Sequence, residues 1–465
     1  MVGDGYSSLI FSIEGVIVFV GVDFGTSNSS IAVYNGDEIR LFNIDPLCLN
    51  PKVLPSYTFI TKEHSTFVGI EAIENYLELE SGRPAVWEKR KAGQVEVTVA
   101  GPGKGPIIYM QDLIVEVDIA AQGRLLQSIK TALRDPKYEG TQIFDRFYSI
   151  EELISLLLTT LREKCEQLIG EPVRNVVIGR PVKFSDNVDT DQRAEEKLLQ
   201  AAKLAGFDQV VFELEPIGGA YLYHQNAFER EKVLVFDFGG GTLDMTIMEL
   251  GKAIPPHTIA THGVLLGGND IDAVLMHTLL KYFGEGSKLD SGHPFPAHIF
   301  EMLFSWQNMV ELSRPEYFQL FRQAQNGSDP EGVGRLESLV RNKLGFKLFQ
   351  RLEQAKVDLS SNHFTQVQFI EQRINLKNKI TRSRFEELIA DELALVDEAI
   401  NELLLKSGLR AAQINAVLRT GGSSSIPAFK NLLADRFSLQ RVKELNLFTT
   451  IVGGLAVKGY ELARN

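Results

Sequence analysis

Cysteine is scarce in this sequence: Cys48 and Cys165 are the only two among 465 residues. Two cysteines that lie far apart supply neither a disulfide framework nor the ligand set of a zinc cluster. A reducing compartment is the simplest expectation, and we predict a cytoplasmic protein. Apolar side chains make up 44% of the chain, enough to bury a large core without help from a disulfide or a metal.

Long apolar runs are also missing. No stretch approaches the roughly 20 apolar residues that a membrane-spanning helix requires, so a membrane is not an expected partner. The apolar residues near the N-terminus are interrupted by Glu14 and Gly15, and no basic segment precedes them. This pattern is not that of a secretory signal peptide, and we predict that residues 1–15 form an extension outside the fold.

Basic stretches are short as well. The richest, residues 88–91, is interpreted as a solvated face. The formal net charge of −12 repels the phosphates of nucleic acids, so nucleic acid is not an expected partner either. What remains is a globular protein of roughly two to four folding units, because the chain is too long for one ordinary domain.

The first informative segment has a strand–turn–strand pattern. The apolar run from Val16 to Val22 predicts a buried strand that ends at Asp23. Strand character resumes at Ser30–Tyr34, and Asn35-Gly36-Asp37 then predicts a hairpin turn. In a Rossmann fold or a P-loop the glycine-rich turn opens a helix instead, so this segment differs from both.

The same pattern occurs again much later in the chain. Lys232–Phe236 predicts a strand that ends at Asp237, residues 239–242 form a glycine-rich turn, and Leu243–Leu250 predicts the return strand. Two similar hairpins, one around Asp23 and one around Asp237, predict that the protein is built from two similar halves.

Both turns combine glycines, hydroxyls and an aspartate. Backbone N–H groups in a glycine-rich turn can point at a phosphate, because glycine permits the dihedral angles and the close approach. Thr26, Ser27 and Thr242 add hydroxyl donors, while Asp23 and Asp237 could hold hydrated Mg²⁺ or orient a water. One such turn is usually an ordinary hairpin, but two that follow buried strands predict phosphate binding.

Two junctions elsewhere offer further polar groups. Glu215-Pro216 stands between a predicted strand, Val210–Leu214, and a helix, where a glutamate also suits the positive end of the helix dipole. Its position between the two aspartate turns favours a role in the site. The turn Thr420-Gly421-Gly422-Ser423 could cover a nucleoside with its backbone, and an ordinary strand-to-helix turn is an equal alternative.

The remaining elements alternate between helices and strands. A Ser149-x-x-Glu152 capping box begins a helix predicted for residues 149–169. The other predictions are a strand at 173–178, a helix at 190–205, a helix beginning at 217, a helix at 384–406, a strand at 416–418, a helix at 427–437 and a final helix around Gly453. Residues 44–147 and 267–380 are predicted to be inserted smaller lobes.

Five motifs occur in an order that resembles a known family. They are residues 20–29, Glu215-Pro216-x-x-x-Tyr221, residues 237–242, Gly267-Gly268-Asn269-Asp270-x-Asp272 and residues 421–427. Together they resemble the nucleotide-binding half of the seventy-kilodalton heat-shock chaperones of the DnaK type, and their short YegD-type relatives still more closely. The resemblance covers residues 16–462. It implies an α/β fold in which a ribonuclease-H-like unit is duplicated, as in actin and hexokinase, to give two lobes at residues 16–230 and 231–465.

The resemblance also implies ATP or ADP with Mg²⁺ in the cleft between the lobes. It makes Asp23, Glu215 and Asp237 the carboxylates around the ion, held through water, and around the attacking water. Lys130 is the candidate for a catalytic lysine at the γ-phosphate, with a position on a helix surface as the alternative, and Thr242 joins the catalytic set. The implied nucleotide contacts are Gly25, Thr26, Ser27, Asn28, Gly239, Gly240, Gly241, Thr242, Gly268, Glu353, Lys356, Ser360, Gly421, Gly422 and Ser423. The spacing of the three from 353 to 360 also suits an exposed helix face.

Three departures from the family pattern affect the expected function. Val357 and Ser425 stand where the family usually has two arginines that sandwich adenine, so stacking on the base is reduced. Phe448-Thr449-Thr450 occupies a place where the family often has an aspartate. The sequence ends at Asn465 without the family's peptide-binding domain, so peptide chaperoning by the usual route is not expected.

We therefore expect a slow, Mg²⁺-dependent ATPase with a chaperone-like role and an unidentified protein partner or client. A sugar or metabolite kinase on the same core is one alternative, although Glu215-Pro216 and the motif at 267–270 argue against it. A nucleotide-gated adaptor or filament-like protein that hydrolyses little is the other, and the missing arginines favour it.

Overall fold

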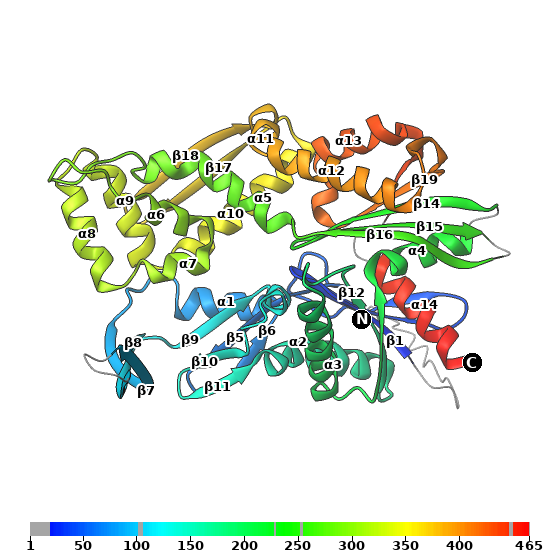
Figure 1. Ribbon diagram of the computed structural model, residues 1–465, viewed down its shortest axis with the longest axis horizontal. Helices are drawn as coiled ribbons and strands as arrows, with labels where there is room; N and C mark the ends of the chain where they lie inside the picture. The colour runs from blue at the N-terminus through cyan, green and yellow to red at the C-terminus, as the bar shows by residue number, and fades with distance from the viewer. Residues whose placement is uncertain (1–18, 101–105, 227–228, 252–253, 446–449, 465) are drawn as a thin grey trace, which may run out of the picture.

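The computed structural model describes residues 19–100, 106–226, 229–251, 254–445 and 450–464. The predicted extension at residues 1–15, the start of the first predicted strand and residues 448–449 lie outside this range. Figure 1 shows two layers of elements, one around β1 (Phe19–Phe24) and the other around β14 (Glu231–Phe238).

The first large sheet has the strand order β13-β12-β1-β2-β3, with β4 paired to β2. β2 runs antiparallel to β1, whereas β12 is parallel to β1 and β13 is parallel to β12. Val20, Val22 and Val176 are fully buried, as expected for strands covered on both faces. The strands other than β1 are β2 (Asn28–Tyr34), β3 (Ile39–Leu41), β4 (Leu54–Pro55), β12 (Asn175–Arg180) and β13 (Gln209–Leu214).

Helices cover both faces of this sheet. α2 (Ile150–Ile169) and α3 (Val188–Leu204) share a core with the side chains of Val20 and Val22 on one face. The predicted capping box of α2 is confirmed, because the Glu152 N–H donates to the Ser149 hydroxyl and the Ser149 N–H donates to the Glu152 carboxylate. α14 (Thr450–Arg464) covers the other face, where Leu455 packs with Val177.

α14 brings the end of the chain back to the first sheet, and glycines make its close packing possible. A Cβ at Gly454 would lie 1.7 Å from the carbonyl oxygen of Gly218 in α4 (Glu215–Asn226). A Cβ at Gly21 would lie 2.4 Å from the backbone nitrogen of Ala456. No larger residue fits at these positions without displacing backbone. The final helix is thus a tightly fitted part of the first sheet's core.

The second large sheet repeats the connectivity of the first. Its strand order is β16-β15-β14-β19-β20, with β15 antiparallel to β14 and β16 antiparallel to β15, while β19 is parallel to β14 and β20 is parallel to β19. α12 (Ala390–Ser407) and α13 (Pro427–Phe437) pack on one face, and α4 packs on the other. The additional strands are β15 (Leu243–Gly251), β16 (Ile254–Val264), β19 (Ala416–Thr420) and β20 (Val442–Glu444).

Smaller elements fill the two segments predicted as insertions. The first contains β5 (Tyr57–Thr61), β6 (Thr66–Val68), α1 (Ile70–Leu79), β7 (Trp87–Ala100), β8 (Pro106–Asp118), β9 (Gly123–Gln127), the 3-10 helix η1 (Ile129–Arg134), β10 (Gly140–Ile143) and β11 (Arg146–Ser149). The second contains α5 (Gly268–Met276), η2 (His277–Phe283), α6 (Ala297–Glu301), η3 (Met302–Phe304), α7 (Trp306–Glu311), α8 (Pro315–Gln325), α9 (Pro330–Arg341), α10 (Gly345–Ser361), β17 (Phe364–Glu371) and β18 (Ile374–Thr381). The division into lobes and inserted subdomains stays a prediction.

One predicted helix is wrong as a single element. The segment 384–406 is divided into α11 (Arg382–Leu388) and α12, with Ile389 between them at φ −94° and ψ 18°. The side chain of Ile389 is fully buried in the core of the second sheet, so tertiary packing overrides the helical periodicity of the sequence here. None of the helices in the described ranges is long and apolar enough to cross a membrane.

Candidate functional site

The two aspartate turns are both β-hairpins at the edge of the large sheets that faces the opposite lobe. Asp23 is the penultimate residue of β1 and pairs in register with Ser30 on β2. Asp237 holds the same position in β14 and pairs with Asp244 on β15. The second turn is closed by the Gly239 N–H, which donates to the carbonyl of Thr242 at 2.9 Å. The strand–turn–strand pattern predicted for both segments is confirmed.

The two turns meet each other directly, and glycine is what allows this. A Cβ at Gly240 would lie 2.0 Å from the hydroxyl oxygen of Ser27, and a Cβ at Gly241 would lie 2.7 Å from that of Thr26. Any side chain at Gly240 would therefore push the two loops apart. The hairpins of the two halves form opposite walls of one narrow space.

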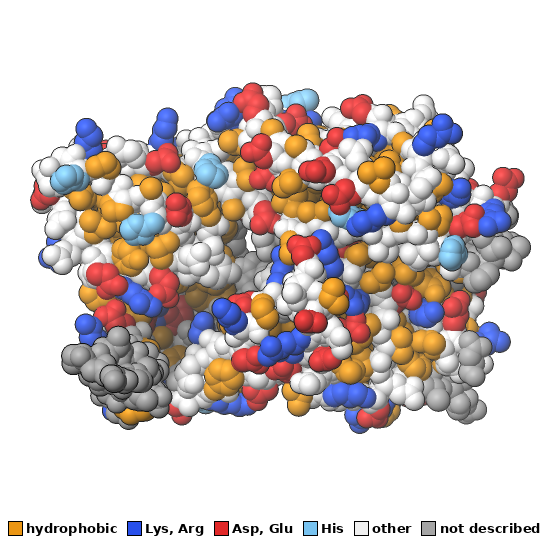
Figure 2. Space-filling model, in the orientation of Figure 1, with side chains coloured by type: hydrophobic (Ala, Val, Ile, Leu, Met, Phe, Trp, Pro, Cys, Tyr) orange, Lys and Arg blue, Asp and Glu red, His pale blue; other side chains and the backbone are white. Residues whose placement is uncertain are grey.

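That space is a cavity of about 280 Å³, and every residue proposed from the sequence for catalysis or nucleotide binding lines it. The lining comes from both hairpin turns, η1, the start of α4, the start of α5, α10 and the turn after β19. A Cβ at Gly422 would meet no atom within 4 Å, so its backbone faces open space. Figure 2 shows a hollow between the two halves of the molecule on the face in view.

Carboxylates accumulate at the floor of this cavity. Glu215 and Asp237 are buried, and Asp23 is partly open to the cavity. Asp244, which sequence reasoning missed, is a fourth carboxylate next to Asp237; it is 1% exposed and lies behind the described lining of the cavity. The sequence could have identified it, because the predicted hairpin places Asp244 directly opposite Asp237. We call these four residues the cleft carboxylates.

Lys130 is the cation that reaches the cleft carboxylates. Its Nζ donates to Glu215 Oε1 at 2.5 Å, and both side chains are less than 9% exposed. The alternative of a lysine on a helix surface is therefore wrong. η1 carries this lysine toward the cavity from the first half of the chain, across from α4.

One lysine does not balance four carboxylates, and the pKa values of three of them respond. Burial, together with the charge of Glu215, raises the pKa of Asp23 from 3.8 to about 7, although Lys130 acts in the opposite direction. Burial and Glu215 likewise raise the pKa of Asp244 to about 7. Burial and the neighbouring carboxylates hold the pKa of Asp237 well above its usual range. The floor of the cavity thus holds more carboxyl groups than its one lysine can keep ionised, and a bound cation would favour their charged forms.

This surplus fits a hydrated Mg²⁺ better than a stripped ion. In the part of the chain that the structure describes, no three His, Cys, Asp or Glu side chains form a group that could hold a metal directly. Mg²⁺ commonly keeps several of its waters and is bound through one or two carboxylates and substrate phosphates. Asp23, Glu215 and Asp237 are the residues that would hold such an ion through its waters.

Backbone and side-chain contacts hold the second hairpin turn in place. The N–H groups of Gly268 and Asn269, at the start of α5, donate to the carbonyls of Gly239 and Gly240 at 3.0 and 2.9 Å. Arg134, also missed from the sequence, donates to the Gly241 carbonyl at 2.5 Å. The turn is thus fixed from both halves of the molecule.

The opposite wall of the cavity comes from α10 and the turn after β19. Lys356 Nζ donates to Asp272 Oδ2 at 2.8 Å and to the Gly268 carbonyl at 3.0 Å, so it is not a freely solvated lysine. Ser360 is half-buried, and Glu353 is exposed at the cavity rim. The Ser423 hydroxyl donates to the Gly239 carbonyl at 3.1 Å.

The two positions where the family usually has arginines differ in their placement. Val357 lines the cavity and is 55% exposed. Ser425 lies in the 3-10 helix η5 (Gly422–Ser425) and is not among the described lining residues. A cation that could stack on a base is thus missing from position 357.

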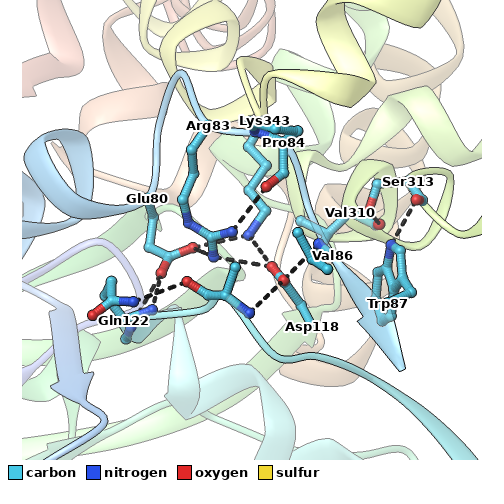
Figure 3. Close-up of polar contacts among 12 residues, drawn as sticks. Glu80, Arg83, Pro84, Val86, Trp87, Asp118, Gln122, Val310, Ser313 and Lys343 are labelled. Atoms are coloured by element: carbon cyan, nitrogen blue, oxygen red, sulfur yellow. Dashed lines mark hydrogen bonds and ion pairs between the residues drawn. The ribbon is translucent and has the colours of Figure 1, made fainter. Parts of the chain in front are cut away.

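A group of charged side chains connects elements of the two predicted insertions, as Figure 3 shows; Glu80 and Lys343 are buried, and Arg83 and Asp118 are half-buried. Lys343, between α9 and α10, pairs with Glu80 Oε2 at 2.8 Å and with Asp118 Oδ2 at 2.7 Å. Arg83 pairs with the same two carboxylates. Nearby, the Trp87 indole N–H donates to the carbonyl of Ser313 at 2.6 Å. We call Glu80, Arg83, Asp118 and Lys343 the bridge cluster, because it connects elements of the two predicted insertions.

The model of the Hsp70 protein family matches residues 123–294 and 338–463, more than half of the chain. The chain belongs to the Hsp70 family. The resemblance predicted from the five motifs is therefore confirmed, and with it the two-lobed α/β architecture of actin-like ATPases.

Individual relatives agree with this assignment. The chain is 24% identical over 457 residues to the chaperone protein DnaK of Thermus thermophilus, an alignment that covers 94% of this chain and 60% of the relative. It is 26% identical over 467 residues to the chaperone protein dnaK of Cyanidioschyzon merolae, with 96% of this chain and 62% of the relative covered. The chain thus spans about three fifths of the length of these curated relatives.

Proposed function

We propose that this Hsp70-family protein binds ATP together with Mg²⁺ between its two halves and hydrolyses it slowly. The observation that carries the proposal is the meeting of two glycine-rich aspartate hairpins directly above the cleft carboxylates and Lys130. Membership of the Hsp70 family supports it, since the same motifs in the same order belong to that family.

The phosphates would lie between the two hairpin turns. Thr26, Ser27 and Thr242 offer hydroxyls there, and the glycines leave backbone N–H groups accessible. Bound Mg²⁺ would neutralise charge on the phosphates, held by Asp23, Glu215 and Asp237 through water. The surplus of carboxyl groups in the cleft is what makes this end of the cavity receptive to a cation.

Hydrolysis requires a water aligned with the terminal phosphorus. Glu215 and Asp237 can accept hydrogen bonds from such a water, and Lys130 can donate to the oxygens of the terminal phosphate. In the structure Lys130 is held by Glu215, so the lysine is already oriented toward the cavity. Catalysis would rest on positioning and charge neutralisation, which suits a slow turnover.

The nucleoside would lie against α10 and the turn after β19. Glu353, Lys356 and Ser360 would face the sugar, while the backbone from Gly421 to Ser423 would cover the base. With Val357 in place of a stacking arginine, we expect moderate affinity and weak selectivity for the base. A lower affinity for ATP than in relatives with both arginines is the expected consequence.

The decisive experiment compares ATP hydrolysis by the wild type and by Asp237→Asn in the presence of Mg²⁺. The substitution keeps the shape and removes one of the central charges, so we expect the rate to fall at least ~100-fold. Asp208→Asn, a change at an exposed aspartate, is the matched control and should leave the rate unchanged. Equal rates for wild type and Asp237→Asn would refute the proposal.

The relatives carry the name chaperone protein, and we propose that ATP turnover here also serves work on a protein partner. An unfolded model protein, such as reduced carboxymethylated lactalbumin, should then accelerate hydrolysis by the full chain. An unchanged rate over a wide range of concentrations would argue for a different use of the ATP.

A further inference from the structure

A second cavity lies next to the proposed nucleotide site and has no role in it so far. Its volume is about 580 Å³. β5, α1 and η1 line it from the first half of the chain, and α5, α7 and α10 line it from the second. Ser27, Asn28, Asn269 and Glu353 line both cavities, so the two spaces adjoin at the first hairpin turn.

Aromatic side chains form much of the wall of this second cavity. They are Tyr57, Phe304, Trp306, Phe346 and Phe349. Phe346 packs edge-on against both Tyr57 and Trp306, with ring centroids 5.8 and 5.1 Å apart. The wall is therefore rigid and offers apolar and π surface to an occupant.

A hydrogen-bonded chain fixes the polar groups on this wall. The Trp306 indole N–H donates to Gln127 Oε1 at 2.5 Å, and Gln127 Nε2 donates to the Tyr57 hydroxyl oxygen at 2.9 Å. These two hydrogen bonds link α7 to β9 and β5, so both halves of the molecule contribute to one continuous surface. The cavity is held in shape without an occupant.

The charged side chains that line the cavity are all acidic. Asp270, Asp272 and Glu353 line it, and none of the described lining residues is Lys, Arg or His. Lys356 offsets part of this charge from the side of the nucleotide site through Asp272 Oδ2. The cavity still carries more acidic than basic groups.

Asp272 is the most deeply buried charge on this wall, and only one of its two carboxylate oxygens is paired. It is 7% exposed, and its second oxygen, Oδ1, finds no hydrogen-bond donor in the described part of the chain. A buried carboxylate oxygen without a donor is destabilising. A positive charge in this cavity would lie beside the Asp272 carboxylate, whose Oδ2 is shared with Lys356.

We propose that the second cavity binds a small organic cation: an amine whose positive end faces Asp272 and whose apolar body packs against the aromatic wall. Aromatic faces attract cations through their quadrupole, and the carboxylates add direct charge attraction. A neutral molecule of the same shape gains the packing without the charge attraction, and an anionic one is repelled by the carboxylates.

Calorimetry on the full chain with three matched probes tests this. The probes are 2-phenylethylamine, 2-phenylethanol and phenylacetate, which share a phenyl body and differ in charge. We expect the amine to bind at least ~10-fold more tightly than the alcohol, and phenylacetate not to bind. Saturating ADP should leave amine binding intact, because Asp272 and the aromatic wall do not line the nucleotide cavity. Equal binding of amine and alcohol, no binding of the amine, or displacement by ADP would each overturn the proposal.

A pair of charge substitutions on α10 locates the site. Gln350 is half-buried on the cavity wall, so Gln350→Lys should weaken amine binding about fivefold and Gln350→Glu should strengthen it by a similar factor. Gln354 is exposed one turn further along α10 and does not line this cavity, so Gln354→Lys is the matched control. Equal effects of the two lysine substitutions would show that the amine binds elsewhere.

Cys48 supplies an independent readout. It is half-buried and lines the second cavity, whereas Cys165 is fully buried in the core of the first sheet. A maleimide should therefore label Cys48 in the folded protein, and 2-phenylethylamine should slow that labelling in proportion to occupancy. If saturating amine does not change the labelling rate of Cys48, the amine binds outside this cavity.

Discussion

The cleft carboxylates and the bridge cluster are both buried groups of charges between the same two halves, yet they are composed in opposite ways. The bridge cluster has two carboxylates and two cations, and each carboxylate also accepts backbone N–H bonds: Glu80 from Gln122 and Gly123, Asp118 from Val86 and Ala120. The cleft has four carboxylates and one lysine that pairs with Glu215. In the bridge cluster every carboxylate is paired with a cation without a ligand, whereas in the cleft the carboxylates outnumber the cations.

The pKa values show the same difference. Burial alone would raise the pKa of Asp118, but hydrogen bonds from Lys343, the Val86 N–H and Arg83 lower it below its usual value. In the cleft, burial and like charges raise the pKa of Asp23 to about 7. A buried charge group that is balanced serves structure, whereas an unbalanced one is prepared for an external cation.

Removal of the central cation from the bridge cluster should have the largest effect on stability. Lys343→Met leaves Glu80 and Asp118 buried with only Arg83, and we expect the free energy of unfolding to fall by about 3–5 kcal/mol. Lys347→Met is the control, since Lys347 and its partner Glu371 are each about one third exposed and such a pair contributes about 0–1 kcal/mol. Urea denaturation measures both. A loss below about 1 kcal/mol for Lys343→Met would mean that the bridge is not a structural unit.

Bound Mg²⁺ should stabilise the folded protein through the cleft carboxylates and should have no effect on the bridge cluster. ADP with Mg²⁺, at about a hundred times the dissociation constant, should raise the free energy of unfolding of the wild type by about 2.7 kcal/mol. Removal of Mg²⁺ by EDTA, or the substitution Asp237→Asn, should abolish most of this gain. The gain should persist in Lys347→Met. A gain that is unaffected by EDTA would indicate that the carboxylates do not hold the ion.

Neutralising one carboxylate should have opposite signs in the two groups. Without nucleotide and Mg²⁺, Asp237→Asn removes a carboxyl whose ionisation is opposed by burial and by its acidic neighbours, so it should raise the free energy of unfolding by ~1 kcal/mol at neutral pH. Asp118→Asn removes a partner from Lys343 and Arg83 and should lower it by about 1–3 kcal/mol. Denaturation curves at neutral pH in EDTA measure both free energies of unfolding. Changes of the same sign in Asp237→Asn and Asp118→Asn would contradict the comparison.

Local patterns in the sequence were enough to predict the hairpins and their aspartates. A buried strand that ends in Asp-x-Gly carries its own signal, so Asp23 and Asp237 could be identified without knowledge of the partner half. Lys130 was identified only through the family resemblance, because its ion pair with Glu215 joins residues that are distant in the chain.

The bridge cluster lay beyond sequence reasoning for a physical reason. Lys343 and Glu80 are 263 positions apart, and neither stands in a recognisable motif. A single lysine is usually solvated, so nothing in the local pattern marks Lys343 as buried. Asp244 and Arg134 are different: their positions beside recognised motifs were visible, and the second hairpin pairs Asp244 with Asp237.

The return of α14 to the first sheet has a consequence for synthesis on the ribosome. Residues 19–214 supply every strand of that sheet, but one of its apolar faces is covered by residues 450–464. The first half can therefore not complete its core until the whole second half has been translated. A nascent chain stalled before residue 450 would expose that face, and this protein would itself need protection while it is being made.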